Sequence, residues 1–187
     1  MKLDGKDKMI ISMYGKDPDI SQEEIAKAIK LSQPSVAIRI KKLRENGALE
    51  TQTGINPLKM GLYMAKVDIS SNNPSEILAM FNNCPYFANG FSISGSKNLC
   101  LFFVSENIST LEAIVNGHLR PNKSVTEVDF NIVINTEKEY IIPTVLTTNQ
   151  VDKPPCGVLI DCKDCRSFGD GKCMGCPATG TYQGWFY

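Results

Sequence analysis

Residues 31–44 form the stretch that most constrains what this chain can fold into. Three of its apolar residues stand at positions i, i+4 and i+7: Val36, Ile40 and Leu43. This spacing predicts a helix with one narrow apolar stripe. Ser32 is a predicted N-cap, and Asn46 with Gly47 is a predicted helix end. The other faces carry amide, hydroxyl and basic groups, so the helix is expected to present a basic polar surface.

Charge is distributed unevenly along a chain whose formal net charge is zero. Residues 27–44 hold six cations and no acid, whereas residues 51–187 hold ten cations and twelve acids. A locally basic segment on a slightly acidic body is typical of a nucleic-acid-binding module joined to a second domain.

Two shorter helical patterns precede the basic stretch. Ile10, Met13 and Tyr14 share one helical face, and a second helix is predicted to begin at Ser21, with Glu24 completing a capping box. Two helices joined by a tight turn, the second basic outside, form a helix-turn-helix. Any three-helix bundle shows similar periodicity, so the polarity of charge on the last helix is what favours double-stranded DNA as a partner.

If this helix lies in the major groove, roles can be predicted for its polar residues. Gln33 and Ser35 are near the N-terminus of the helix and are predicted to reach base edges. The amide group of Gln33 suits adenine. Ala37 and Ile38 are further candidates. Four cations are predicted to contact phosphates and to make binding salt-dependent: Arg39, Lys41, Lys42 and Arg44.

From residue 62 onward the pattern is strand, helix, strand, strand, helix, strand. The predicted strands are residues 63–69, 87–93, 99–104 and 128–134. This order predicts a ferredoxin-like α+β domain, an antiparallel sheet with two helices on one face. The other face needs cover, so a homodimer or higher homo-oligomer is expected.

Four segments are therefore expected along the chain. They are a winged helix-turn-helix at 1–55 with its wing at 48–55, a linker at 56–61, a ferredoxin-like effector and dimerisation domain at 62–150, and a cysteine-rich metal-binding extension at 151–187. One more strand is predicted at 140–145. No apolar run is long enough to span a bilayer, and the charged N-terminus lacks a signal-peptide core, so a soluble cytoplasmic protein is expected.

The C-terminal segment carries cysteines at metal-ligand spacing: Cys156, Cys162, Cys165, Cys173 and Cys176. In a reducing compartment such clustering favours a metal over disulfides. The two Cys-x-x-Cys pairs favour structural Zn²⁺. The Cys176-Pro177 pair and the additional Cys156 are instead typical of an iron–sulfur cluster, which stays open as the alternative.

The two remaining cysteines and the single histidine are predicted to have structural roles. Cys84 and Cys100 lie in apolar contexts and are predicted to be core thiols. His118, at the end of a helix, is predicted to lie at the surface or to cap.

Several short motifs follow one another over residues 1–136: Leu3-Asp4, Ile10-Ile11, Ile20-Ser21, Glu24-Ile25-Ala26, Leu31-Ser32, Arg39-Ile40-Lys41, Gly47-Ala48-Leu49 and residues 55–62. In this order they resemble the Lrp/AsnC (feast/famine) transcriptional regulators. The resemblance implies a DNA-binding dimer or larger assembly in which a small molecule, often an amino acid, binds between effector domains.

The resemblance also places a candidate effector site at the turn between the second and third strands. Family members usually carry a Gly there, followed three residues later by an acid that meets the amino group of the ligand. Gly95 is kept in this chain, but Asn98 stands at the acidic position. A neutral amide cannot neutralise an ammonium group as a carboxylate does, so the expected effector is not an ordinary amino acid.

A non-enzymatic regulator of transcription is therefore the leading prediction, with control by a small-molecule effector, by the state of a cysteine-bound metal centre, or by both. Sirohaem decarboxylases share the two-domain layout, but they need many histidines and arginines, whereas residues 51–187 hold one histidine and two arginines. A protein-interaction adaptor docking through the cysteine segment is the third hypothesis, and it predicts no salt-sensitive DNA binding.

Overall fold

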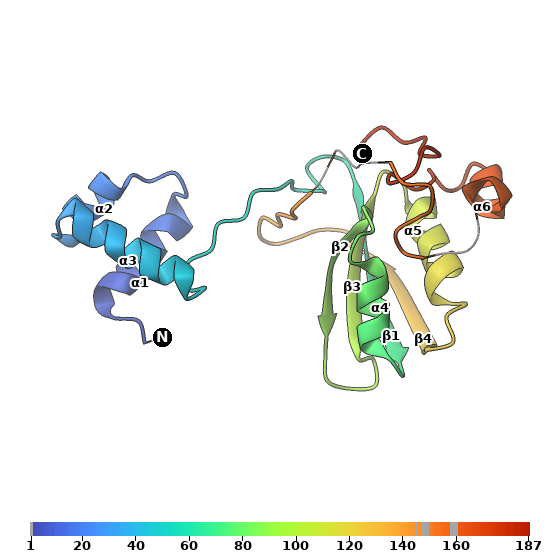
Figure 1. The fold of residues 1–187 in the computed structure, drawn as a ribbon, viewed down its shortest axis with the longest axis horizontal. Coiled ribbons are helices and arrows are strands. Elements are labelled where there is room, and N and C mark those ends of the chain that lie inside the picture. The colour runs from blue at the N-terminus through green and yellow to red at the C-terminus, as the bar shows by residue number, and fades with distance from the viewer. Residues whose placement is uncertain (1, 145, 147–149, 158–160) are drawn as a thin grey trace. The chain divides into compact units, whose positions relative to one another are not determined.

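The computed structural model describes residues 2–144, 146, 150–157 and 161–187, and it divides into two compact units, Met1–Gln52 and Thr53–Tyr187 (Figure 1). The first unit consists of α1 (Gly5–Lys16), α2 (Gln22–Ile29) and α3 (Gln33–Glu45). These are the three helices that the sequence predicts. No helix in the described ranges is long and apolar enough to cross a membrane.

The apolar stripe of α3 is the centre of the first unit. Six aliphatic side chains from the three helices are buried together: Ile10, Ile25, Ile29, Val36, Ile40 and Leu43. Burying one such side chain contributes about 1.5–3 kcal/mol. The stripe alone therefore fixes which face of α3 turns inward.

The serines at the starts of α2 and α3 behave differently. The Glu24 amide donates to Ser21 Oγ at 3.2 Å, and the Ser21 amide donates to the Glu24 carboxylate at 3.0 Å, which confirms the capping box. Ser32 has the backbone geometry of an N-cap but makes no capping bond. Its hydroxyl lies 2.8 Å from that of Ser35 instead. The predicted boundary is confirmed, while the capping bond is not formed.

The predicted wing contains no strand pair of its own. Residues 48–54 contain no strand, and Ile55 instead forms a backbone bridge with Ile142, with N–H···O distances of 3.0 and 2.9 Å. A Cβ on Gly54 would lie 1.9 Å from the Ile142 carbonyl oxygen, so only glycine permits this approach. The predicted strand at 140–145 is reduced to the same bridge, and Val145 lies outside the described residues.

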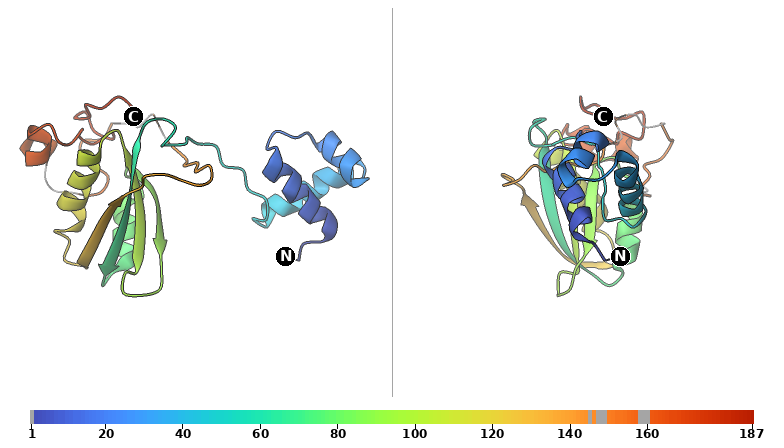
Figure 2. Two further views of the ribbon diagram at one scale, coloured as in Figure 1. Left: turned by 180° about the vertical axis from the view of Figure 1, so that it is seen from behind. Right: turned by 90° about the vertical axis from the view of Figure 1, so that its left-hand side faces the viewer.

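The second unit has the predicted ferredoxin-like order. Its elements are β1 (Tyr63–Ser71), α4 (Pro74–Phe81), β2 (Phe87–Ser92), β3 (Leu99–Ser105), α5 (Ile108–Ile114), the π-helical turn η1 (Val115–Leu119) and β4 (Val125–Ile132). The strands form one antiparallel sheet in the order β2-β3-β1-β4. Helices α4 and α5 cover the same face (Figure 2), and their apolar side chains share one core with the strands.

The opposite face of the sheet is mixed in character: it is polar along β1 and β4, but along β2 and β3 it carries Phe102 and Phe91, which is 48% exposed. Lys66 and Asp68 alternate with the buried residues of β1 and form an ion pair on this face. Their neighbours in β4 are Asn131 and Asp129. One end of this face is covered by the chain itself, where Ile55 and Ile142 pack in a small apolar cluster with Met64 of β1. The exposed apolar part of this face along β2 is compatible with cover by a second copy, and dimerisation stays a proposal.

Strand β4 begins and ends earlier than predicted. It covers Val125–Ile132, and Ile134, which was placed in the strand, is 89% exposed. Period-two alternation continues past the last ladder position, so the sequence pattern alone does not mark the end of pairing.

The cysteine-rich segment folds back against the sheet domain. It contains η2 (Cys162–Asp164) and α6 (Arg166–Gly169) and lies beside α5 (Figure 1). The Tyr86 hydroxyl donates to the Gly175 carbonyl at 2.6 Å, and the Met174 amide donates to Thr110 Oγ1 at 3.0 Å. The segment thus takes part in the second unit through bonds to the turn before β2 and to α5.

The two serines provide a matched pair of substitutions. Ser21→Ala removes a capping bond and is expected to destabilise the first unit by about 1 kcal/mol, whereas Ser32→Ala is expected to leave its stability nearly unchanged. Hydrogen exchange of the α2 backbone amides measures the difference. Equal effects of the two changes would contradict the assigned capping.

Candidate nucleic-acid interface and cysteine-lined cavity

The outward surface of α3 gathers most of the residues predicted to face DNA. These side chains are exposed: Gln33, Ser35, Ile38, Lys41, Lys42 and Arg44. Ile38 is 70% exposed and is the large apolar residue on this surface. Ala37 is half-buried.

Arg39 is oriented away from this exposed set. Its guanidinium donates to Asp4 at 2.7 Å and to Asp7 at 2.6 Å, and so joins α3 to the start of α1. The Asp7 amide and then Arg39 hold the pKa of Asp4 below its usual range, while the two carboxylates raise the pKa of Arg39. A guanidinium flanked by two carboxylates presents little net positive charge to a phosphate.

The other cations of α3 are less engaged. Lys41 approaches Glu45 at 3.8 Å, a contact between two exposed side chains that contributes little. Lys42 and Arg44 have no ion-pair partner in the part of the chain that the structure describes. These side chains therefore leave a local excess of positive charge near the C-terminal end of α3.

The candidate effector residue Asn98 is bonded to the end of β1. Its side-chain carbonyl accepts from the Ser71 amide at 2.9 Å, and its side-chain NH₂ donates to the Ser71 carbonyl at 2.7 Å. The amide thus extends the β1–β3 ladder by imitating a backbone partner. Gly95 lies in the turn with φ +118°, a conformation that favours glycine. Effector binding at these two residues remains a prediction.

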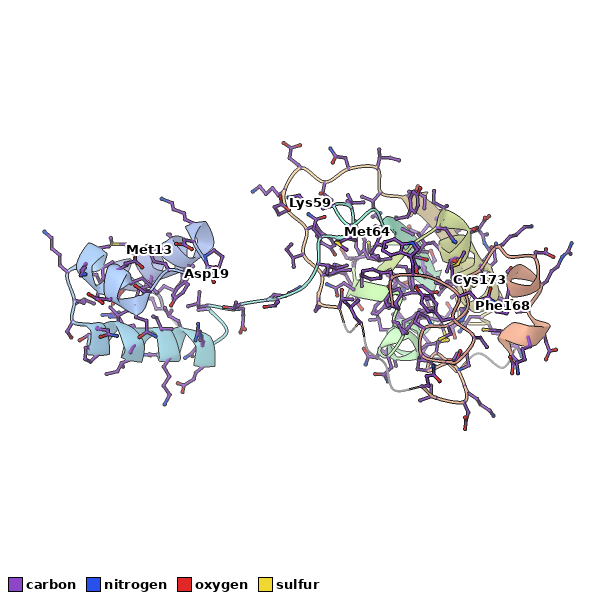
Figure 3. The ribbon with its side chains drawn as sticks, turned by 90° about the horizontal axis from the view of Figure 1, so that it is seen from above. Met13, Asp19, Lys59, Met64, Phe168 and Cys173 are labelled. Carbon is purple, nitrogen blue, oxygen red and sulfur yellow. The ribbon has the colours of Figure 1, made fainter. Side chains whose placement is uncertain are left out.

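Six cysteines line one cavity of about 100 Å³ in the second unit: Cys84, Cys156, Cys162, Cys165, Cys173 and Cys176. The five cysteines of the C-terminal segment are thus brought together, as their spacing suggests. Figure 3 shows Cys173 with Phe168, which also lines the cavity. No described cysteine forms a disulfide.

Cys84 is the member that sequence reasoning missed. It lies between α4 and β2, and its neighbours in the cavity come from the far end of the chain, so no local spacing announces it. His118 also lines the cavity, and its Nδ1 lies 3.0 Å from the Ile114 carbonyl oxygen, a capping contact within its own helix. Cys100 is buried in β3.

Burial dominates the electrostatics of the cavity. It raises the pKa of Cys84 and Cys173, and it raises the pKa of Cys176 to about 11. Backbone amides act in the opposite direction: that of Gly175 on Cys173, and those of Ala178 and Thr179 on Cys176. Among the described His, Cys, Asp and Glu residues, no three stand close enough together to form a ready site for one metal ion.

Known proteins resemble this chain in sequence and in fold. Residues 3–50 match a family model described as winged helix-turn-helix DNA-binding. The transcriptional regulator AzlB of Bacillus subtilis is 28% identical over 146 residues, which cover 74% of this chain and 93% of AzlB.

Solved structures show the same fold. Escherichia coli AsnC has a TM-score of 0.66 at 14% identity and is matched over 99% of its own length and 76% of this chain. A Neisseria meningitidis transcriptional regulator in complex with L-Met has a TM-score of 0.65 at 17% identity, covering 73% of this chain and 93% of that one. The chain is a DNA-binding transcription regulator of the Lrp/AsnC type. It is longer than AzlB, of which nearly the whole length is matched.

The bonds of Asn98 make a specific prediction for this regulator. Asn98→Asp replaces a donor with a carboxylate oxygen that faces the Ser71 carbonyl, so it is expected to destabilise the second unit by about 1–3 kcal/mol. Unfolding followed by the fluorescence of Trp185, the single tryptophan, measures the change.

Asn135→Asp is the matched control, because Asn135 is exposed and uses only its side-chain oxygen, as acceptor from the Thr136 amide. Equal stability of the two variants would show that the Asn98 bonds are unimportant.

Proposed function

We propose that this regulator places α3 in the major groove of double-stranded DNA. The observation that carries the proposal is the division of the helix. One stripe is buried, and the rest presents amide, hydroxyl and methyl groups at the N-terminal half and cations at the C-terminal half. In a helix-turn-helix, the N-terminal residues of the second helix are those that contact bases.

Base contacts are proposed for Gln33, Ser35 and Ile38. The Gln33 amide can donate to and accept from adenine, and an apolar side chain can pack on the methyl group of thymine. This gives the exposed Ile38 a partner, since contact with a methyl group would remove its apolar surface from water. Ser35 already lies 2.8 Å from the Ser32 hydroxyl, which leaves it an acceptor and positions it.

Phosphate contacts are proposed for Lys41, Lys42 and Arg44. Cations that neutralise phosphates release counterions and make affinity fall steeply with salt. Arg39 is given a different role from the one that the sequence predicts. Its pairing with Asp4 and Asp7 positions α3 relative to α1 rather than supplying charge to DNA.

A homodimer with two α3 helices on a pseudo-palindromic site completes the proposal, because two-fold symmetric proteins of this kind read two half-sites. A small-molecule response is supported by the regulator solved in complex with L-Met. The side chain of Asn98 is an amide and is already hydrogen-bonded to Ser71. The effector of this chain is therefore not recognised by an acid at that position of the turn.

Two substitutions separate base contacts from phosphate contacts. Lys42→Ala is expected to weaken binding to every duplex about equally and to lower the slope of log affinity against log salt by about 1. Gln33→Ala is expected to remove about 1–3 kcal/mol of discrimination at one base position. Binding of a duplex library at several salt concentrations measures both effects.

Lys123→Ala is the control, since Lys123 is exposed in the second unit. If Lys42→Ala and Gln33→Ala behaved alike on all sequences, the proposed division of α3 would be wrong.

Arg39 provides a further test. Arg39→Ala is expected to destabilise the first unit by about 1 kcal/mol, because Asp7 is largely buried and loses its charged partner. The salt slope of the folded protein should stay unchanged. A slope reduced by about 1 with unchanged stability would return Arg39 to the phosphate-contacting set.

A further inference from the structure

We propose that the cysteine-lined cavity of the second unit binds an iron–sulfur cluster, with Cys84 of the sheet domain closing the site around the cysteines of the C-terminal segment. This goes beyond DNA recognition and does not depend on it.

The first observation is the convergence of thiols from separate segments. Cys84 comes from the turn before β2. Cys162 begins η2 and Cys165 follows it, while the last two come after α6: Cys173 and Cys176. Cys156 adds a further buried side chain. Since soft thiolate ligands select zinc, copper(I) or iron–sulfur clusters, this donor set restricts the occupant to few chemistries.

The arrangement of the cysteines around a cavity favours the polynuclear occupant. Four thiolates around one zinc ion lie about 2.3 Å from it and therefore about 3.8 Å from one another. Within the described ranges no three ligating side chains gather in that way. The cysteines instead surround a cavity of about 100 Å³, as they would around a cluster whose thiolates bind different iron atoms.

The backbone around the last two cysteines is shaped for sulfur ligands. Gly175 has φ +80°, and a Cβ there would lie 2.5 Å from the Thr181 carbonyl oxygen, so the Cys173–Cys176 turn requires glycine. Its amide hydrogen-bonds to Cys173, and two further amides hydrogen-bond to Cys176. Hydrogen bonds to cluster sulfurs are among the features that tune such centres.

Part of the cavity wall is apolar. Tyr86 is buried and donates to the Gly175 carbonyl, and Ile114 and Phe168 supply apolar surface. Each thiol that binds iron releases its proton, so binding replaces neutral thiols by thiolates paired with the metal. Cys84 makes the site span two parts of the unit, so the bound cluster would tie the C-terminal segment to the turn before β2.

The test uses the full chain, purified without oxygen and then incubated with ferrous iron and sulfide as the probes. The proposal predicts bound iron with a comparable amount of acid-labile sulfide and visible absorption from thiolate-to-iron charge transfer. The double change Cys173→Ser with Cys176→Ser should abolish both. Cys84→Ser should accelerate bleaching of the absorption by an iron chelator by several-fold.

Cys100→Ser is the matched control, because Cys100 is buried in β3 and does not line the cavity. Circular dichroism and salt-dependent DNA binding show whether each variant is folded, and retained DNA binding separates failure of this proposal from failure of the regulator function. Stoichiometric zinc without sulfide, or no metal after reconstitution, would overturn the cluster. Equal bleaching rates for the native and Cys84→Ser proteins would remove Cys84 from the site.

Discussion

The narrow apolar stripe of α3 is the constraint on which the DNA-facing surface depends. Val36, Ile40 and Leu43 fill the space between α1 and α2, and no wider face of the helix is buried. The other faces of the helix are thus free to carry polar and charged groups without loss of packing. The pairing of Arg39 with Asp4 and Asp7 fixes the position of α3 relative to the start of α1.

The second unit is organised by a different constraint, the alternation of β1. Its odd-numbered residues Ala65, Val67 and Ile69 lie under α4 and α5, and its even-numbered residues face the polar side of the sheet. The partners of the cysteine-rich segment are Thr110 of α5 and Tyr86, which lies just before β2. A segment too short to form its own core thereby acquires fixed positions for its thiols.

Features that depend on local periodicity could be predicted from the sequence. The three N-terminal helices, the capping box at Ser21 and the ferredoxin-like order all follow from spacing within a few residues. Features that depend on a distant partner could not. The tertiary fold sets the pairing of Arg39 with Asp4, and it brings Cys84 into the same cavity as Cys176. It also pairs Ile55 with Ile142, more than eighty residues away, which no local pattern predicts.

The most direct test of the account is an NMR titration of the isotope-labelled full chain with duplex DNA at low and high salt. Binding that is independent of sequence is strong enough at low salt for any duplex to serve. The account predicts that the largest shifts lie at Gln33, Ser35 and Ile38 and along the cationic end of α3, and that they weaken as salt rises. Shifts confined to the second unit, with α3 unchanged at low salt, would contradict it.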